Sequence, residues 1–376
     1  MRSILSFDAA GFAAAARGLF LERRGDVAGS GLALQLYKLF HCEGRFAAEL
    51  VQPRALAVWQ GGFDFQPPLT LAGRAAEDGA LKLVFQTADG HRVESVLIAM
   101  PGGNGAKATL CLSSQVGCAM GCAFCRTGTM GLIRDLRAEE IVAQAWLARR
   151  QLGLSFGNLV FMGMGEPLDN LAGLAQALRV LTDGSGLAFG QERVTVCTCG
   201  HVDGLRAFAA LGYKRIGLSV SLNAPDDATR SRLMTVNRRW PLAALEAALL
   251  AYPRRRNFYF ALNYCLIPGV NDSAEAAAGV AAFARRVGRC LVNLIPYNPG
   301  GALDAPSPTD PEIERFLGWL KAAGVEARRR GAKGQSIMAA CGQLGGPADQ
   351  VSNATCQTVP ASVCVATGKS IWPEKT

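Results

Sequence analysis

The segment Gly117-Cys118-Ala119-Met120-Gly121-Cys122-Ala123-Phe124-Cys125 carries three cysteines in the pattern C-x-x-x-C-x-x-C. It follows the apolar run 108–113, which we predict to be a strand, so the cysteines lie in the loop after that strand. Three thiolates this close can each ligate one corner of a [4Fe–4S] cluster and leave the fourth iron open. A structural zinc site would need a fourth cysteine or histidine, and none lies nearby in sequence. Zinc completed by a distant residue is the alternative.

Strands are predicted to recur along the rest of the chain. The predicted strands span 108–113, 159–162, 193–197, 215–221, 258–267 and 290–295. The segments between them, such as 138–152 and 203–211, carry apolar residues at helical spacing. Six strands that alternate with helices predict an α/β fold, an incomplete (β/α)6 barrel whose loops at the carboxyl ends of the strands build the site.

Residues 1–100 differ from the rest of the chain in their sequence pattern. We predict a small N-terminal accessory domain over 1–100, with a helix in 31–46 and a β-hairpin formed by 81–85 and 91–98. The glycine-rich connector 101–105 predicts a boundary before a second domain at 106–345. Residues 346–376 are rich in Ser, Thr, Pro and Lys, and we expect a poorly ordered tail.

Composition limits the class of protein. Half of the residues are hydrophobic, which excludes a wholly disordered chain. No apolar run approaches the ~18 residues that span a bilayer, so we expect a cytoplasmic protein with no membrane contact. Twelve unevenly spaced cysteines do not form a disulfide framework in a chain this long. The net charge of +9 fits a polyanionic partner, and a basic enzyme that binds no nucleic acid fits it equally well.

The cysteine spacing after the first barrel strand resembles that of the radical S-adenosylmethionine (SAM) superfamily. The resemblance implies that Cys118, Cys122 and Cys125 hold a [4Fe–4S] cluster whose open iron binds SAM. An electron from a reductant such as flavodoxin then releases a 5′-deoxyadenosyl radical. The motif Gly163-Met164-Gly165-Glu166-Pro167 fits a contact with SAM, because glycine permits close backbone approach and the carboxylate accepts from an ammonium group. An ordinary turn at the strand end is the alternative.

Further motifs narrow the resemblance to the RlmN/Cfr family of ribosomal and transfer RNA adenine methyltransferases. They are Val93-Glu94-Ser95-Val96, Leu110-Cys111-Leu112-Ser113-Ser114-Gln115, Arg193-Val194-Thr195, Gly269-Val270-Asn271-Asp272, Leu294-Ile295-Pro296-Tyr297-Asn298-Pro299 and Ala339-Ala340-Cys341-Gly342-Gln343-Leu344. They occur in the family's order over residues 80–345. The resemblance implies a methyltransferase that modifies an adenine ring carbon, C2 in preference to C8, in 23S rRNA, tRNA or both. We expect a monomer whose N-terminal domain contacts RNA.

The resemblance also implies a role for three catalytic residues. Cys341 takes a methyl group from one SAM molecule, and a radical made from a second SAM molecule activates that methyl group for addition to adenine. Cys111 then attacks the Cys341 sulfur, which releases the product and leaves a transient disulfide. Glu94 matches the family's proton acceptor.

A basic run precedes Cys341 in the sequence. It consists of Arg328, Arg329, Arg330 and Lys333. Cations near a thiol lower its pKa, so this run predicts a lowered pKa for Cys341. Contact with phosphate groups and a merely solvated surface are the alternatives.

Cofactor contacts carried over from the family comprise Gly165, Glu166, Cys197, Ser221, Leu222, Asn223 and Asn298. Four positions in three stretches depart from the family pattern. Cys197-Thr198-Cys199-Gly200 replaces Ser-Thr-Ser-Gly, Ser221-Leu222-Asn223 replaces Ser-Leu-His, and Ser336 replaces an aspartate. These departures leave open a divergent paralogue with another substrate. A radical activase for a glycyl partner and an RNA-binding protein with a structural metal are further alternatives.

Overall fold

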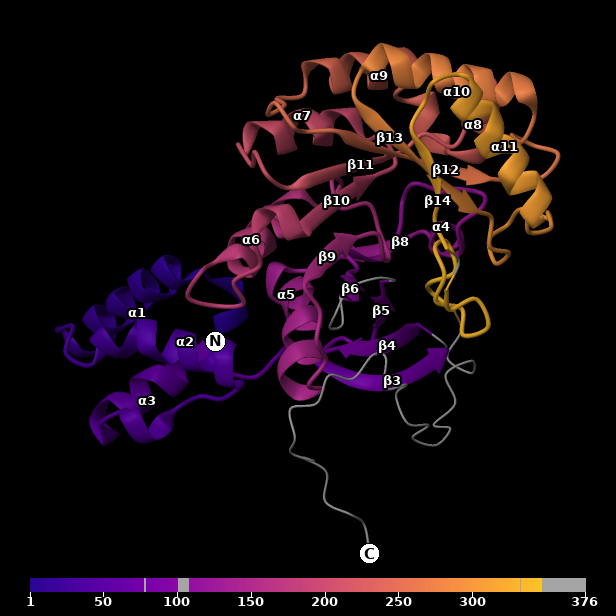
Figure 1. Cartoon of the computed structure of the whole chain (residues 1–376). Coiled ribbons are helices and arrows are strands. Elements are labelled where there is room, and N and C mark those ends of the chain that lie inside the picture. Colours follow the sequence, from indigo (N-terminus) through magenta and orange to yellow (C-terminus); the bar gives the residue numbers. More distant parts are fainter. Residues whose placement is uncertain (78, 101–107, 332, 347–376) are drawn as a thin grey trace, which may run out of the picture.

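The computed structural model describes residues 1–77, 79–100, 108–331 and 333–346 (Figure 1). The predicted connector 101–105 lies outside the described residues, and so does the predicted tail from residue 347 onward. No helix within the described ranges is long and apolar enough to cross a bilayer.

One ten-stranded sheet organises the chain, in the order β14-β13-β12-β11-β10-β9-β6-β5-β4-β3. Its parallel part contains β6 (Ala108–Cys111), β9 (Asn158–Phe161), β10 (Val194–Thr198), β11 (Gly217–Ser221), β12 (Phe260–Leu266) and β13 (Cys290–Pro296). These six strands match the six predicted ones and confirm the α/β barrel fold. The short strand β14 (Ala327–Arg329) adds a seventh parallel strand that the sequence did not predict.

Helices follow the parallel strands and lie against the outer face of the curved sheet (Figure 1). They are α5 (Ala138–Trp146), α6 (Leu171–Thr182), α7 (Val202–Ala210), α8 (Asp227–Leu233), α9 (Leu242–Ala251), α10 (Ala274–Val287) and α11 (Asp310–Ala322). Their starts are fixed by local chemistry: the Ser273 side chain caps α10, and Thr309 with Glu312 forms a capping box on α11. Because each helix follows a strand, the loops that connect them lie at the carboxyl ends of the strands, where the site is built.

The antiparallel part of the sheet comes from the N-terminal third. Strands β4 (Ala80–Thr87) and β5 (Arg92–Ala99) form the predicted hairpin, and β5 pairs with β6, so the hairpin continues the barrel sheet. Strand β3 (Leu69–Glu77) was not predicted, because a bulge between Leu71 and Gly73 interrupts its alternation.

A group of helices precedes this hairpin. Helices α1 (Ala9–Arg24), α2 (Ala33–Glu43) and α3 (Pro53–Gly62) pack around a cluster of aromatic rings, with the Phe12 and Phe63 centroids 4.8 Å apart. The helix predicted within 31–46 corresponds to α2. In Figure 1 this group lies to one side of the barrel.

Candidate active site

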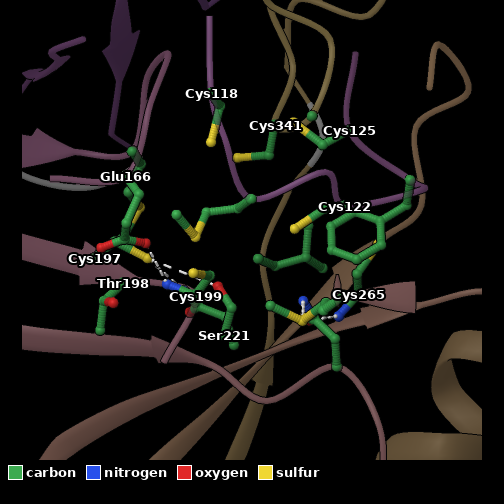
Figure 2. Close-up of a pocket in the computed structure, with 18 of the residues that line it drawn as sticks. Cys118, Cys122, Cys125, Glu166, Cys197, Thr198, Cys199, Ser221, Cys265 and Cys341 are labelled. Carbon is green, nitrogen blue, oxygen red and sulfur yellow. Dashed lines mark hydrogen bonds between the residues drawn. The ribbon is translucent and has the colours of Figure 1, made fainter. Parts of the chain in front are cut away.

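A cavity of about 920 Å³, open to solvent, lies at the carboxyl ends of the parallel strands. Its wall brings together residues far apart in sequence: Cys118, Cys122, Cys125, Gly165, Glu166, Cys197, Ser221, Asn223, Asn298 and Cys341. In Figure 2, the side chains of Cys118, Cys122, Cys125 and Cys341 lie together, with Glu166 and Cys197 across the pocket from Cys122. The position of this cavity is that of the active site in barrel enzymes.

The three-cysteine loop is shaped by its own hairpin. It connects β7 (Gln115–Gly117) to β8 (Leu132–Asp135) and includes the short helix α4 (Arg126–Thr129). Gly117 has a φ of 77°, and a Cβ at this position would lie 1.9 Å from the Gly131 carbonyl oxygen. The Cys118 N–H donates to the same carbonyl at 2.8 Å. The loop closes only with glycine at position 117.

The chemistry of the three thiols is that of the protein ligands of a [4Fe–4S] cluster. Among the described residues, no group of three or more Cys, His, Asp or Glu side chains is placed to hold one metal ion. A [4Fe–4S] cluster instead spreads its ligands over separate irons, which suits three thiols around one cavity. Burial raises the pKa of Cys118 to about 12 and that of Cys122 well above its ordinary value. A bound cationic group would offset this burial, because ligation favours thiolates.

Cys341 reaches this cavity because its segment is tied to the three-cysteine loop. The Arg126 N–H donates to the Gly342 carbonyl at 2.7 Å, and the Thr127 hydroxyl donates to the Leu344 carbonyl at 2.7 Å. On its other side, the Asn298 Nδ2 donates to the Cys341 carbonyl at 3.1 Å. The chain thus holds Cys341 beside the cysteines of residues 118–125 although more than two hundred residues separate them.

A second cavity, of about 1220 Å³, opens on the side of the barrel and contains both Cys111 and Cys341 in its wall. It shares Met162, Asn298 and Cys341 with the first cavity. Its wall combines these two thiols with apolar side chains such as Val96, Ile98 and Leu344. Arg330 and Lys333 also line it and give it positive charge.

The pKa predicted for Cys341 is wrong in direction. Although the residue as a whole is exposed, desolvation of its thiol at the cavity wall raises the pKa of Cys341 more than Arg330 lowers it. The other cations of the run are engaged elsewhere: Arg329 pairs with Asp310 at 2.7 Å, and Lys333 donates to the Ala99 carbonyl at 2.7 Å. Burial also raises the pKa of Cys111, and the nearby Cys341 raises it further.

Glu94 is held in a buried ion pair that the sequence did not reveal. Its Oε1 lies 3.0 Å from the Lys82 Nζ, and its Oε2 accepts from the Gly345 N–H at 3.1 Å. Lys82 also donates to the Met338 carbonyl at 3.2 Å, in the segment that carries Cys341. On β5, Glu94 is two residues before Val96, which pairs with Cys111, and the Glu94 carbonyl accepts from the Ser113 hydroxyl at 2.6 Å. It is 4% exposed and is not part of the wall of either cavity.

Glu166 and Gly165 border the first cavity. The Glu166 carboxylate accepts from the Cys199 N–H at 2.7 Å and the Leu168 N–H at 3.1 Å, and burial raises its pKa. Gly165 has a φ of 98°, and a Cβ there would lie 2.5 Å from the Gln115 Cβ. Close packing against Gln115 therefore requires glycine at position 165. The contact of Gly165 and Glu166 with SAM stays a prediction.

The remaining predicted cofactor residues fall into two groups. Cys197 and Ser221 line the cavity with their sulfur and hydroxyl 3.9 Å apart, and burial raises the pKa of Cys197 to about 12. Asn223 also lines it, but its Oδ1 accepts from the Cys265 N–H at 2.8 Å. Leu222 instead packs in the hydrophobic core and is absent from the cavity wall, so its side chain does not support the predicted contact.

Arg230 is a site residue that sequence reasoning missed. It is fully buried, and its guanidinium donates to the carbonyls of Cys199 at 2.6 Å and Ser221 at 3.1 Å. It thereby joins the carboxyl ends of β10 and β11. Cys199 and Cys265, which were not predicted as site residues, also line the cavity. No local sequence signal distinguishes Arg230 from the many surface arginines.

Comparison with known proteins agrees with this geometry. The Radical SAM superfamily model matches residues 112–279. A radical SAM methyltransferase from Sphaerobacter thermophilus, known from its crystal structure, superimposes with a TM-score of 0.81 and 35% identity, covering 91% of this chain and 99% of that one. The chain is therefore a radical SAM enzyme of the methyltransferase type.

Curated relatives give the family. The dual-specificity RNA methyltransferase RlmN of Anaeromyxobacter dehalogenans is 42% identical over 84% of this chain and 87% of its own length. A probable dual-specificity RNA methyltransferase, RlmN 1 of Protochlamydia amoebophila, is 42% identical over 70% of this chain and 72% of its own. The chain belongs to the RlmN family of radical SAM RNA methyltransferases.

Proposed function

We propose that this enzyme methylates C2 of an adenine in 23S rRNA, in tRNA or in both, through a methyl group carried on Cys341. The observation that carries the proposal is that Cys341 lines both cavities, the one with Cys118, Cys122 and Cys125 and the one with Cys111. Both RNAs are cytoplasmic, and we place the enzyme there.

Cys341 first acts as a nucleophile. Its thiolate attacks the methyl carbon of one SAM molecule, an S–C bond forms, and the sulfonium C–S bond breaks to release S-adenosylhomocysteine. When bound, a [4Fe–4S] cluster on Cys118, Cys122 and Cys125, with a second SAM molecule and an electron from a reductant such as flavodoxin, supplies a 5′-deoxyadenosyl radical that removes a hydrogen atom from the S-methyl group. Cys341 thereby holds a one-carbon unit next to the cavity where the adenine binds.

Cys111 then separates the enzyme from its product. The methylene radical on Cys341 first forms a bond to the adenine C2, and the adduct returns one electron to the reductant and loses the C2 proton to a base. The Cys111 thiolate then attacks the Cys341 sulfur, and a disulfide forms as the bond from that sulfur to the transferred carbon breaks. The electron pair of the broken bond stays on the carbon, which takes up a proton and becomes the methyl group. Both residues are free thiols in the structure and line the same cavity, which is the reduced arrangement that this step needs. Cellular thiols can reset such a disulfide.

Glu94 is our candidate acceptor for the proton of the adenine ring carbon. Lys82 and the Gly345 N–H fix the position of its carboxylate. Glu94 lies outside the wall of both cavities and next to the segment that carries Cys341.

One departure from the family pattern has a local explanation. Ser336 donates from its N–H and its hydroxyl to the same carboxylate oxygen of Glu77, at 2.9 and 2.8 Å. An aspartate at 336 would repel Glu77, so the change reflects a different partner in this chain. It gives no support to the divergent-paralogue alternative.

The test is to compare modified adenosines in rRNA and tRNA from cells with and without this gene by mass spectrometry. We expect 2-methyladenosine to disappear with the gene and purified protein to carry a methyl group on the Cys341 peptide. Cys111→Ala is expected to accumulate protein cross-linked to RNA, and Cys341→Ala is the control that forms no cross-link. An 8-methyladenosine product would correct the position, and an unmethylated Cys341 with unchanged RNA would refute the proposal. Gel filtration tests the expected monomer.

A further inference from the structure

A third cavity lies at the opposite end of the barrel from the three cysteines. Its wall includes Thr195, Gly217 and Ala261, which stand at the starts of β10, β11 and β12, whereas Thr198, Ser221 and Cys265 near the ends of these strands line the first cavity. This cavity encloses about 780 Å³ of space that is partly open to solvent. Nothing in the proposed reaction uses this end of the barrel.

Positive charge dominates this cavity. Its wall contains four arginines, Arg215, Arg255, Arg328 and Arg330, and one acid, Glu192. Glu192 forms an ion pair with Arg215 at 3.3 Å, and Arg328 donates to the Asn293 Oδ1 at 2.9 Å. Within the described part of the chain, no acidic side chain pairs with Arg255 or Arg330. The cavity therefore attracts an anion, and guanidinium groups suit phosphate in particular.

A buried hydroxyl in the wall independently indicates a ligand. Ser219 is 0% exposed and lines the cavity. Its Oγ has no oxygen or nitrogen partner and lies beside the thiol of its cross-strand neighbour Cys197, which is a weak hydrogen-bonding group. Buried hydroxyls normally have a hydrogen-bond partner. A hydroxyl at a cavity wall without an oxygen or nitrogen partner can therefore donate to, or accept from, a bound molecule or water. A phosphate or sugar oxygen matches it chemically.

The rim carries an aromatic ring. Tyr259 is 49% exposed at the edge of the cavity, close in sequence to Arg255. An exposed ring beside arginines is the combination that holds a single-stranded base and its phosphate. The same cavity shares Met162, Arg328 and Arg330 with the side cavity that contains Cys111 and Cys341. An RNA strand that leaves the side cavity would reach Arg328 and Arg330 next.

We propose that this cavity binds a nucleotide that flanks the target adenosine in the substrate RNA, with its phosphate on Arg215, Arg255 and Arg330 and its base on Tyr259. The proposal rests on the function proposed above. A free nucleotide would present the same chemistry, but the exposed arginines and the continuity with the side cavity favour a continuous strand. The subsite would position RNA and take no part in the chemistry at Cys341.

The test compares the binding of an unmodified tRNA transcript to the full holoenzyme and to Arg215→Gln/Arg255→Gln, by fluorescence anisotropy over about 50–200 mM salt. We expect about tenfold weaker binding and a shallower salt dependence, lower by one to two units in the log–log slope. The control is Arg206→Gln/Arg315→Gln, which removes two exposed charges on α7 and α11, outside all three cavities, and should bind within about twofold of the parent. Equal binding by both double variants would overturn the subsite.

A second measurement separates the two sources of phosphate. AMP should compete with the transcript for the parent enzyme, and Ser219→Ala should weaken this competition about threefold, in line with one lost hydrogen bond. AMP binding that is lost in Arg215→Gln/Arg255→Gln while transcript binding is unchanged would assign the cavity to a free nucleotide and overturn the RNA assignment.

Methylation of Cys341, followed by mass spectrometry, should be unchanged in both the Arg215→Gln/Arg255→Gln and Ser219→Ala variants. Its absence from the parent enzyme would refute the proposed function, whereas normal methylation with unchanged RNA binding would refute the subsite alone.

Discussion

The three-cysteine loop and the segment that carries Cys341 meet in one cavity but are held in different ways. The loop closes on itself through the β7–β8 hairpin and the backbone of Gly117. The segment 334–346 has neither helix nor strand and depends on partners far away in sequence, such as Lys82 and Asn298. The comparison teaches that a cluster-binding motif can be local, whereas the thiol that works with it is placed by the whole fold.

The largest effect is expected at the three-cysteine loop, the locally closed member of this comparison. Cys122→Ala should lower the iron content from about four per chain to background and abolish RNA methylation, because it removes one cluster ligand. The folded apoprotein should keep its thermal stability, because the Cys125 N–H to Cys122 carbonyl bond at 3.0 Å involves only backbone. Iron and sulfide analysis with calorimetry measures both. The control is Cys290→Ala, because Cys290 lies outside all three cavities. A Cys122→Ala enzyme that keeps its full iron content would disprove the ligand assignment.

A smaller effect is expected where the Cys341 segment is anchored. Lys82→Met leaves the Glu94 carboxylate buried without its partner and should lower the free energy of unfolding by about 3–5 kcal/mol. It also removes the bond to the Met338 carbonyl, so methylation of Cys341 should slow while iron content is unchanged. Denaturant unfolding of Lys82→Met and of Lys82→Met/Glu94→Gln is the measurement, and the double variant should recover part of the loss. Equal stability of parent and Lys82→Met would argue against the anchor.

The smallest effect concerns the charge next to Cys341. Burial raises the pKa of this thiol and Arg330 lowers it, so Arg330→Gln should raise the pKa further. A higher pKa leaves less thiolate at neutral pH, and alkylation of Cys341 should then need a more alkaline solution, with a shift below about one pH unit and a rate loss below about tenfold. Iodoacetamide labelling of the Cys341 peptide against pH measures this. Arg329→Gln, whose parent side chain pairs with Asp310, should leave the profile in place.

Much of the fold could be predicted because buried parallel strands are short apolar runs between helices. All six predicted barrel strands and the hairpin strands β4 and β5 are present. Strand β3 was missed because its bulge breaks the alternation, and β14 because three residues with two arginines resemble a surface loop. The latter strand forms only because β13 offers it a free edge.

The structure brings the predicted cysteines together, since Cys118, Cys122, Cys125 and Cys341 line one cavity and Cys111 and Cys341 line another. Their spacing pointed to the first three and the family resemblance to Cys111 and Cys341, and the roles of all five stay predictions. The pKa of Cys341 was predicted in the wrong direction, because sequence proximity of cations does not reveal burial. Lys82 and Arg230 were missed, since a buried lysine or arginine looks like a surface one until its partners are known.

The sequence by itself determined the chemical groups of this enzyme: three closely spaced thiols, two further thiols and a regular alternation of strands and helices. Tertiary structure decided which of these groups share a cavity, which charges are buried, and that the far end of the barrel collects arginines from β11, β12 and β14 and the loops beside them. The physical reason is that spacing along the chain fixes only local geometry. Desolvation, ion pairing and the approach of distant thiols depend on the packing of the whole sheet.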